Sequence, residues 1–228
     1  MGLHNDDLCG PVGPLSRIWT GSCDSATDFS SIASATPGLG FARIGGTTAV
    51  HLRGPVTVAK TLSCPSDSEY FGVDFRLGAH LTLFPRAGLV NGEIVLPTLP
   101  DGRILLDGRE WELPTPQNVD VFVERLVRSG LLVVDPLVEE LRHEGRIRGM
   151  AERTAQSRFV RAVGVSRRTL LVIERARSAA RRLRAGASIA EVVGDGGYHD
   201  QPHLTRALRR MIGHTPGELV RGGMFLDL

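Results

Sequence analysis

The stretch that decides the fold of this chain is residues 188–213, SIAEVVGDGGYHDQPHLTRALRRMIG. Ser188, followed three residues later by Glu191, forms a capping box, which predicts that a helix begins there. Gly196 and Gly197 should end that helix, because adjacent glycines supply backbone angles that other residues avoid. The stretch therefore predicts two short helices joined by a tight turn.

The second predicted helix has one apolar and one polar side. Asp200 is a suitable cap, and Pro202 is tolerated in a first turn. The residues that should face the protein recur at helical spacing: Leu204, Ala207, Leu208 and Met211. The other side carries polar and basic residues: Gln201, His203, Thr205, Arg206, Arg209 and Arg210. Such a face suits a DNA major groove, because arginine can pair with guanine and glutamine with adenine. The alternative for this stretch alone is a helical hairpin with a solvated face.

Residues 197–216, GYHDQPHLTRALRRMIGHTP, resemble the second helix-turn-helix of AraC/XylS-type transcriptional regulators. The signature of that family runs close to G-Y/F-x-D-Q-x-H-F/L-x-R-x-F/L-K/R-R-x-x-G-x-T-P. The matching residues are Gly197, Tyr198, Asp200, Gln201, His203, Leu204, Arg206, Leu208, Arg209, Arg210, Gly213, Thr215 and Pro216. The resemblance implies an all-α DNA-binding domain with two helix-turn-helix units joined by a linker helix.

The side chains of the second unit divide into two expected roles. We expect Gln201, His203 and Arg206 to contact bases, with Thr205 supporting them. Two further arginines suit phosphate contacts: Arg209 and Arg210.

Residues 150–164, MAERTAQSRFVRAVG, resemble the recognition helix of the first helix-turn-helix in the same family. Arg153 and Gln156 should face outward and contact DNA, with Arg158 on the flank. The helix that should precede this one is abbreviated to HEGRIRGM. The first unit therefore either docks less firmly or uses residues 137–144 as its supporting helix through a longer turn.

The long helix expected from Ser166 to Gly186 resembles the linker helix of the family. A rigid linker would fix the separation of the two units. Both could then enter successive major grooves on one face of the DNA, about one helical turn apart.

The N-terminal half differs from the C-terminal half in residue composition and in sequence pattern. Residues 1–40 are rich in Gly, Ser, Pro and Thr, and we expect this segment to be partly irregular. Residues 41–116 contain short runs with β-branched or aromatic residues, and turn signals at Asn91-Gly92 and Asp107-Gly108. These features favour a small sandwich or barrel. The family resemblance implies that this domain serves as a sensor, and the alternative is a structural or dimerisation domain.

The predicted fold class is α+β, with a β-rich N-terminal domain followed by an all-α domain. Pro114-Thr115-Pro116 marks the boundary, residues 117–149 form a helical connector, and residues 150–228 form the DNA-binding domain. Charge supports this division. Residues 1–116 hold 8 basic and 12 acidic residues, net −4, and residues 145–228 hold 16 and 7, net +9. The second half is therefore the expected polyanion binder.

Nothing in the sequence indicates catalysis, a metal or a cofactor. The histidines of the β-rich half, His51 and His80, have no metal-ligand spacing. No P-loop or nucleophile elbow is present, and GLGFARIGG at residues 38–46 does not lead into a helix. Two alternatives stay open: a β-barrel enzyme with a helical appendage, and a protein that coats DNA without specificity.

The cysteines and the N-terminus suggest the compartment. Cys9, Cys23 and Cys64 are odd in number and lack metal-ligand spacing, so we expect reduced thiols in a cytoplasmic protein. The first residues do not form a secretory signal, and no apolar run is long enough to span a membrane.

Double-stranded DNA is the predicted partner. A small-molecule effector and a homodimer are open alternatives, and RNA polymerase is a further partner if the chain is an activator. The aromatic residues of the N-terminal half either line an effector pocket or fill a core: Trp19, Phe71, Phe75, Phe84 and Trp111.

Overall fold

The computed structural model describes residues 3–9, 13–84, 86–224 and 226. The chain divides into two compact units. Unit 1 comprises Met1–Thr27, Thr36–Pro55 and Cys64–Arg167, and unit 2 comprises Asp28–Ala35, Val56–Ser63 and Arg168–Leu228. The predicted α+β class, with a β-rich N-terminal region followed by a helical region, is confirmed. The last boundary between the two compact units lies after Arg167, and two N-terminal segments belong to unit 2.

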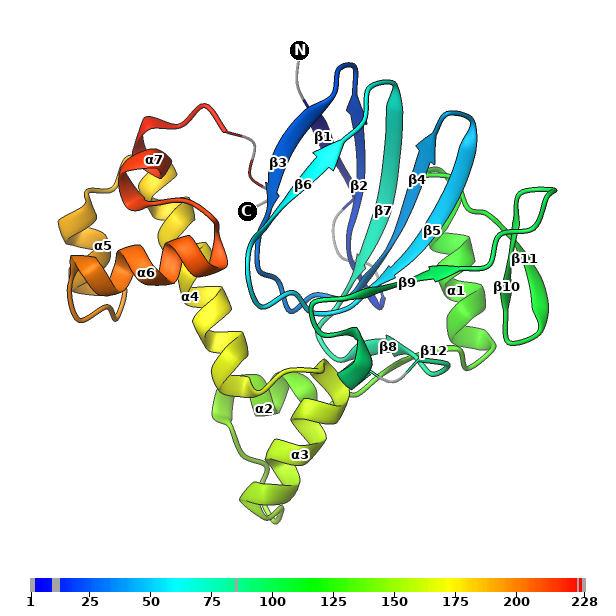
Figure 1. The fold of residues 1–228 in the computed structure, drawn as a ribbon. Coiled ribbons are helices and arrows are strands. Elements are labelled where there is room, and N and C mark those ends of the chain that lie inside the picture. Colours follow the sequence, from blue (N-terminus) through cyan, green and yellow to red (C-terminus); the bar gives the residue numbers. More distant parts are fainter. Residues whose placement is uncertain (1–2, 10–12, 85, 225, 227–228) are drawn as a thin grey trace. The chain divides into compact units, whose positions relative to one another are not determined.

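Unit 1 is built on a six-stranded antiparallel sheet (Figure 1). Its strands, in spatial order, are β1 (Leu3–Cys9), β2 (Leu15–Cys23), β7 (Ser68–Phe75), β4 (Gly38–Ile44), β5 (Thr47–Arg53) and β9 (Glu93–Leu96). Two smaller sheets pair β8 (Ala79–Leu81) with β12 (Leu132–Val134) and β10 (Arg103–Leu106) with β11 (Arg109–Glu112). The helical elements of the unit are a 3-10 turn at Arg86–Leu89, α1 (Val119–Arg128), α2 (Val138–Glu144) and α3 (Glu152–Val163).

Two-residue turns join two pairs of neighbouring strands. Asp107 and Gly108 connect β10 to β11 with φ angles of 52° and 68°, the positive pair that a tight hairpin turn requires. Gly45 and Gly46 do the same between β4 and β5, with φ angles of 56° and 80°. The Asp107-Gly108 prediction is confirmed. The GLGFARIGG segment forms strand β4 and the turn that follows it.

Residues 1–40, which we expected to be partly irregular, contain more regular structure than their composition suggests: β1, β2, β3 (Thr27–Ser31) and the start of β4. The strand β2 pairs on both sides, with β1 and with β7, and buries Leu15 and Ile18. These long-range pairings satisfy the backbone of a sequence whose composition alone favours loops. The part of the expectation that concerns residues 1–2 and 10–12 lies outside the described residues.

The aromatic side chains of unit 1 mostly fill a core. Phe75 and Trp111 are buried, and Phe71 and Phe84 pack against the same apolar cluster. The cavity lined by Phe75 and Phe84 has a volume of about 20 Å³. That volume has room for about one water molecule, far below the several hundred Å³ of a small-molecule pocket.

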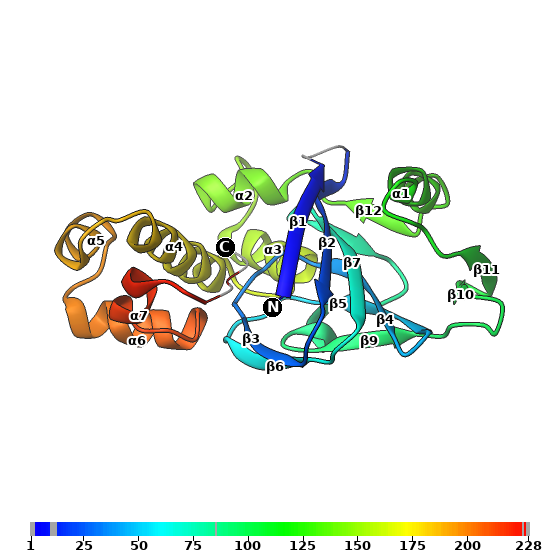
Figure 2. The ribbon, with the colours of Figure 1, turned by 90° about the horizontal axis from the view of Figure 1, so that it is seen from above.

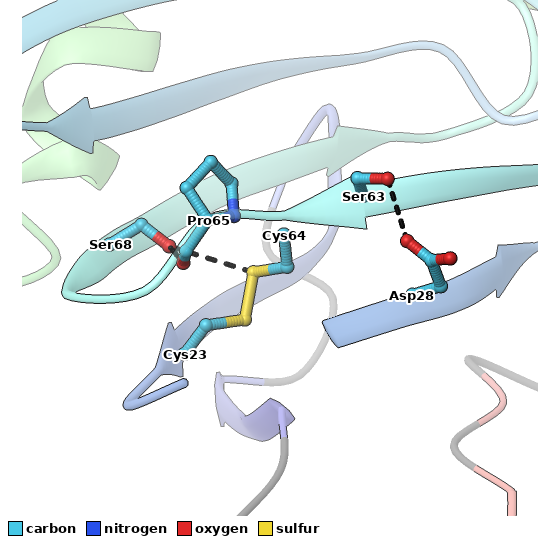
Figure 3. Close-up of a disulfide and its surroundings, with 6 residues drawn as sticks. All are labelled: Cys23, Asp28, Ser63, Cys64, Pro65 and Ser68. Carbon is cyan, nitrogen blue, oxygen red and sulfur yellow. Dashed lines mark hydrogen bonds between the residues drawn. A yellow bond between two sulfur atoms is a disulfide. The ribbon is translucent and has the colours of Figure 1, made fainter. Parts of the chain in front are cut away.

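Cys23 and Cys64 form a disulfide, so the expectation of reduced thiols is wrong for these two residues (Figure 3). Cys23 is the last residue of β2, and Cys64 is the last residue of β6 (Lys60–Cys64). Their Cα atoms are 6.4 Å apart, within the range that a disulfide can bridge. Strand pairing between distant segments creates this proximity.

The described residues of unit 2 form four helices and a two-stranded sheet. The helices α4 (Arg167–Arg184), α5 (Ile189–Asp195), α6 (Gln201–Met211) and α7 (Pro216–Arg221) form one group (Figure 2). They share a buried cluster that includes Ile173, Val192, Leu204 and Leu219. The sheet pairs β3 with β6. No helix in the described part of the chain is long and apolar enough to cross a membrane.

Candidate nucleic-acid interface

The helix α5 begins with the predicted capping box. The hydroxyl oxygen of Ser188 accepts a hydrogen bond from the backbone N–H of Glu191 at 3.2 Å, and Glu191 accepts one from the backbone N–H of Ser188 at 2.7 Å. The backbone hydrogen bond from Ser188 is the main reason that the pKa of Glu191 lies below its usual value. The sequence therefore defines the start of α5 through local contacts alone.

Contacts from Arg175 and from Asp200 hold the turn between α5 and α6. Gly197 has a φ of 69°, as its sequence context predicts. The guanidinium of Arg175, on α4, donates to the carbonyl of Gly197 at 3.1 Å and lies over the ring of Tyr198 at 5.2 Å. Asp200 then caps α6 by accepting from the backbone N–H of His203 at 2.7 Å. These contacts fix the position at which α6 begins.

The helix α6 presents the predicted polar face to solvent. Leu204, Leu208 and Met211 are buried, as expected. The exposed residues are Gln201, Pro202, Arg206, Arg209 and Arg210, and the half-buried ones are His203, Thr205 and Ala207. No hydrogen bond or ion pair to any described residue occupies the guanidinium of Arg206. The face thus offers side-chain donors and acceptors to a ligand.

Two residues of this face make internal hydrogen bonds that leave other atoms available. The Nδ1 atom of His203 accepts from the backbone N–H of His199 at 3.2 Å, so in the neutral ring the proton lies on Nε2, which can donate outward. The hydroxyl of Thr205 donates to the carbonyl of Gln201 at 2.9 Å and can still accept a hydrogen bond. Both geometries are compatible with contacts to DNA.

A second helical pair lies in unit 1, where α2 packs against α3. The inner side of α3 is buried, through Ala155, Phe159, Ala162 and Val163. The guanidinium of Arg167 donates to the carbonyls of Arg142 and His143 at 2.8 and 3.0 Å, which satisfies the C-terminal end of α2. The helix α2 thus lies beside α3, where the second of the two alternatives would place it, and its role as a supporting helix stays a prediction. We call α2 and α3 the first head, and α5 and α6 the second head.

The predicted DNA-contacting residues of the first head have internal partners to different degrees. Arg158 forms two hydrogen bonds with the carboxylate of Asp135, at 2.9 and 3.1 Å. Gln156 donates to Glu152 at 2.9 Å, while Arg153 is exposed. A contact of Arg158 with DNA would require it to leave Asp135, a partner that the sequence did not indicate because it lies 23 residues away.

Asp135 is the acidic partner in the ion pair with Arg158. Burial alone would raise the pKa of its carboxyl group, but hydrogen bonds from Arg158 and from the backbone of Leu137 outweigh burial and lower it. A groove of about 610 Å³ lies beside this pair. It is lined by His80, Asp135, Arg153, Thr154, Ser157, Arg158, Arg161 and Ala162. The outer side of α3 therefore faces a concave surface of mixed charge, whereas the outer side of α6 is basic and open.

Comparison with known proteins identifies the C-terminal region. Residues 146–222 match the family model of a helix-turn-helix domain, of the AraC type. The match begins after α2 and continues to the end of α7. No curated protein and no solved structure matches the chain. Residues 146–222 are therefore similar to helix-turn-helix domains of the AraC type, a family of DNA-binding transcription regulators.

Proposed function

We propose that this chain is a sequence-specific transcription regulator in which α6 is the main DNA-contacting helix. The observation that carries the proposal is the outer face of α6. It combines an unoccupied guanidinium at Arg206 with the amide of Gln201 and the Nε2–H of His203. A helix of this composition, fixed at its N-terminus by Asp200, has the side chains that a major groove requires.

We assign the contacts by the chemistry of each group. Arg206, Gln201 and His203 contact base edges, where a good pair contributes about 1–3 kcal/mol of discrimination. Thr205 supports them. Arg209 and Arg210 contact phosphates, which provide affinity that is independent of sequence and falls as salt concentration rises.

The first head makes the secondary contact, through Arg153 and Gln156. The chain runs from the first to the second head through α4, whose 18 residues span about 27 Å at 1.5 Å per residue. Effector binding, dimerisation and contact with RNA polymerase stay predictions for the remainder of the chain.

Selection of bound sequences from a random DNA pool tests this proposal. A motif with two half-contacts about one turn apart supports two working heads. One short motif supports the second head alone. Recovery of no enriched motif would contradict the proposal and favour a protein that coats DNA without specificity.

A further inference from the structure

Two segments from the N-terminal half of the sequence contact the C-terminal end of α6. We call residues 28–35 and 56–63 the arm; both belong to unit 2. The backbone N–H of Ala33 donates to the carbonyl of Met211 at 2.7 Å, and that of Ala59 donates to the carbonyl of Arg210 at 2.8 Å. The last carbonyls of a helix have no partner within the helix, so the arm caps α6.

Side chains of the arm pack around the same helix end. The hydroxyl of Ser30 lies 3.0 Å from Nε2 of His214, within hydrogen-bond distance. Gly213 has a φ of 86°, and a Cβ atom there would lie 3.4 Å from side-chain atoms of Ser30 and Ala59. Ala33 belongs to the buried cluster that holds the apolar face of α6. The arm is therefore an integral part of the packing of the second head.

The Cys23–Cys64 disulfide ties the ends of the arm together (Figure 3). Cys23 lies four residues before β3, and Cys64 is the last residue of β6. Between the two strands, the hydroxyl of Ser63 donates to Asp28 at 2.6 Å. The bond closes a loop with a sequence separation of 41 residues that contains both arm segments. Loss of the bond would increase the conformational freedom of the arm.

We propose that the Cys23–Cys64 bond is a redox-controlled latch that holds the arm against α6 and thereby positions α6 for DNA. The inference rests on the proposed function. Disulfides are rare in proteins of reducing compartments, and those that occur there are usually catalytic or redox-sensing. Control of the arm, and through it of the DNA-contacting helix, would give the Cys23–Cys64 bond a redox-sensing role.

Release of the latch is a thiol–disulfide exchange. A thiolate of a dithiol reductant attacks one sulfur of the Cys23–Cys64 bond, which forms a mixed disulfide, breaks the bond between the two cysteines and releases the other cysteine as a thiolate. The second thiol of the reductant displaces the remaining cysteine. The products are two protein thiols and the oxidised reductant, with two electrons transferred. The sulfur atoms are buried, since Cys23 is 1% and Cys64 2% exposed, so we expect the exchange to be slow in the folded protein.

The test uses the full chain, oxidised or treated with excess dithiothreitol, with the thiol state confirmed by alkylation and mass spectrometry. Fluorescence anisotropy measures binding to a duplex that carries the selected motif and to a scrambled duplex. We expect reduction to weaken binding to the selected duplex by about tenfold, within the usual range of coupling between two sites. Binding to the scrambled duplex should change little.

Two variants and one further measurement make the test specific. The Cys23→Ser variant should bind like the reduced protein and should not respond to reductant. The Cys9→Ser variant, which keeps both sulfur atoms of the bond, should respond like the wild type. Hydrogen exchange should show faster amide exchange on reduction in residues 28–35, 56–63 and 208–214, with circular dichroism unchanged.

Several outcomes would overturn the latch. Free Cys23 and Cys64 in air-oxidised protein, equal amide exchange in the two redox states, or equal affinity for the selected duplex would each do so. With equal affinity, only the latch fails and the proposed function stands. If neither redox form prefers the selected duplex, the proposed function fails and the latch fails with it.

Discussion

The two heads have the same predicted role but different surroundings. The second head has a side-chain cap at the start of each helix, at Ser188 and Asp200, and its outer arginine Arg206 has no internal ion pair among the described residues. The first head has no side-chain cap at the start of α3, and its Arg158 is bound to Asp135. The outer arginine of α6 is therefore available to a ligand, whereas Arg158 of α3 is already paired within the protein.

This difference between the two heads indicates how much each contributes to DNA recognition. An arginine that leaves an internal carboxylate to bind DNA loses one ion pair as it gains another, so its net contribution to affinity is small. An unpaired arginine gains the contact in full. We therefore expect Arg158 to add little, which leaves the first head with Arg153 and with Gln156, itself bound to Glu152. Most discrimination between DNA sequences should then come from the second head.

The largest expected effect follows from removing one buried core side chain in each head. Leu208→Ala should cost the second head about 2–5 kcal/mol, because it removes a fully buried side chain and leaves a cavity. Phe159→Ala should cost the first head about 3–5 kcal/mol. Hydrogen exchange and DNA titration check the pair. We expect Leu208→Ala to abolish binding to the selected duplex and Phe159→Ala to retain part of it; the reverse order would assign the main contact to the first head.

A smaller effect concerns the helix caps, and its sign should differ between the heads. Ser188→Ala removes a side-chain cap and should destabilise α5 by about 1 kcal/mol. Ala151, at the start of α3, has the extended backbone of a cap position but no side chain to accept a hydrogen bond. Ala151→Ser should therefore stabilise the first head by about 0.5–1 kcal/mol. Denaturation monitored by hydrogen exchange measures both changes, and a change of the same sign in both would refute this account of the caps.

The smallest effect is the pH dependence that Asp135 gives to the first head. The pKa of Asp135 is lower in the folded chain than its usual value of 3.8. Its contribution to stability is therefore present above about pH 4 and is lost as the pH falls through the folded-state pKa. Amide signals of α3 in NMR spectra should lose protection below about pH 4 in the wild type, and less so in Asp135→Asn. Equal acid sensitivity in the two proteins would show that the Asp135–Arg158 pair does not stabilise this head.

The sequence predicted features that depend on local contacts. The caps at Ser188 and Asp200, the turn at Gly197 and the buried face of α6 all arise within a few residues of one another, so their spacing is visible in the sequence. The strands β1 and β2, the pair between Asp135 and Arg158, and the Cys23–Cys64 bond join residues far apart in the chain. With three cysteines, spacing cannot identify which two are bonded. Nor could the sequence indicate that residues 28–35 and 56–63 pack with α6, because that contact depends on the path of the strands between them.

The most direct measurement compares Arg206→Ala with the wild type on the selected and the scrambled duplex at one fixed salt concentration. Arg153→Ala is the matched variant in the first head. The account predicts that Arg206→Ala loses about 1–3 kcal/mol of binding free energy on the selected duplex and much less on the scrambled one, with a smaller loss for Arg153→Ala. An equal loss on both duplexes would make Arg206 a phosphate contact and would contradict the assignment of α6 as the helix that recognises sequence.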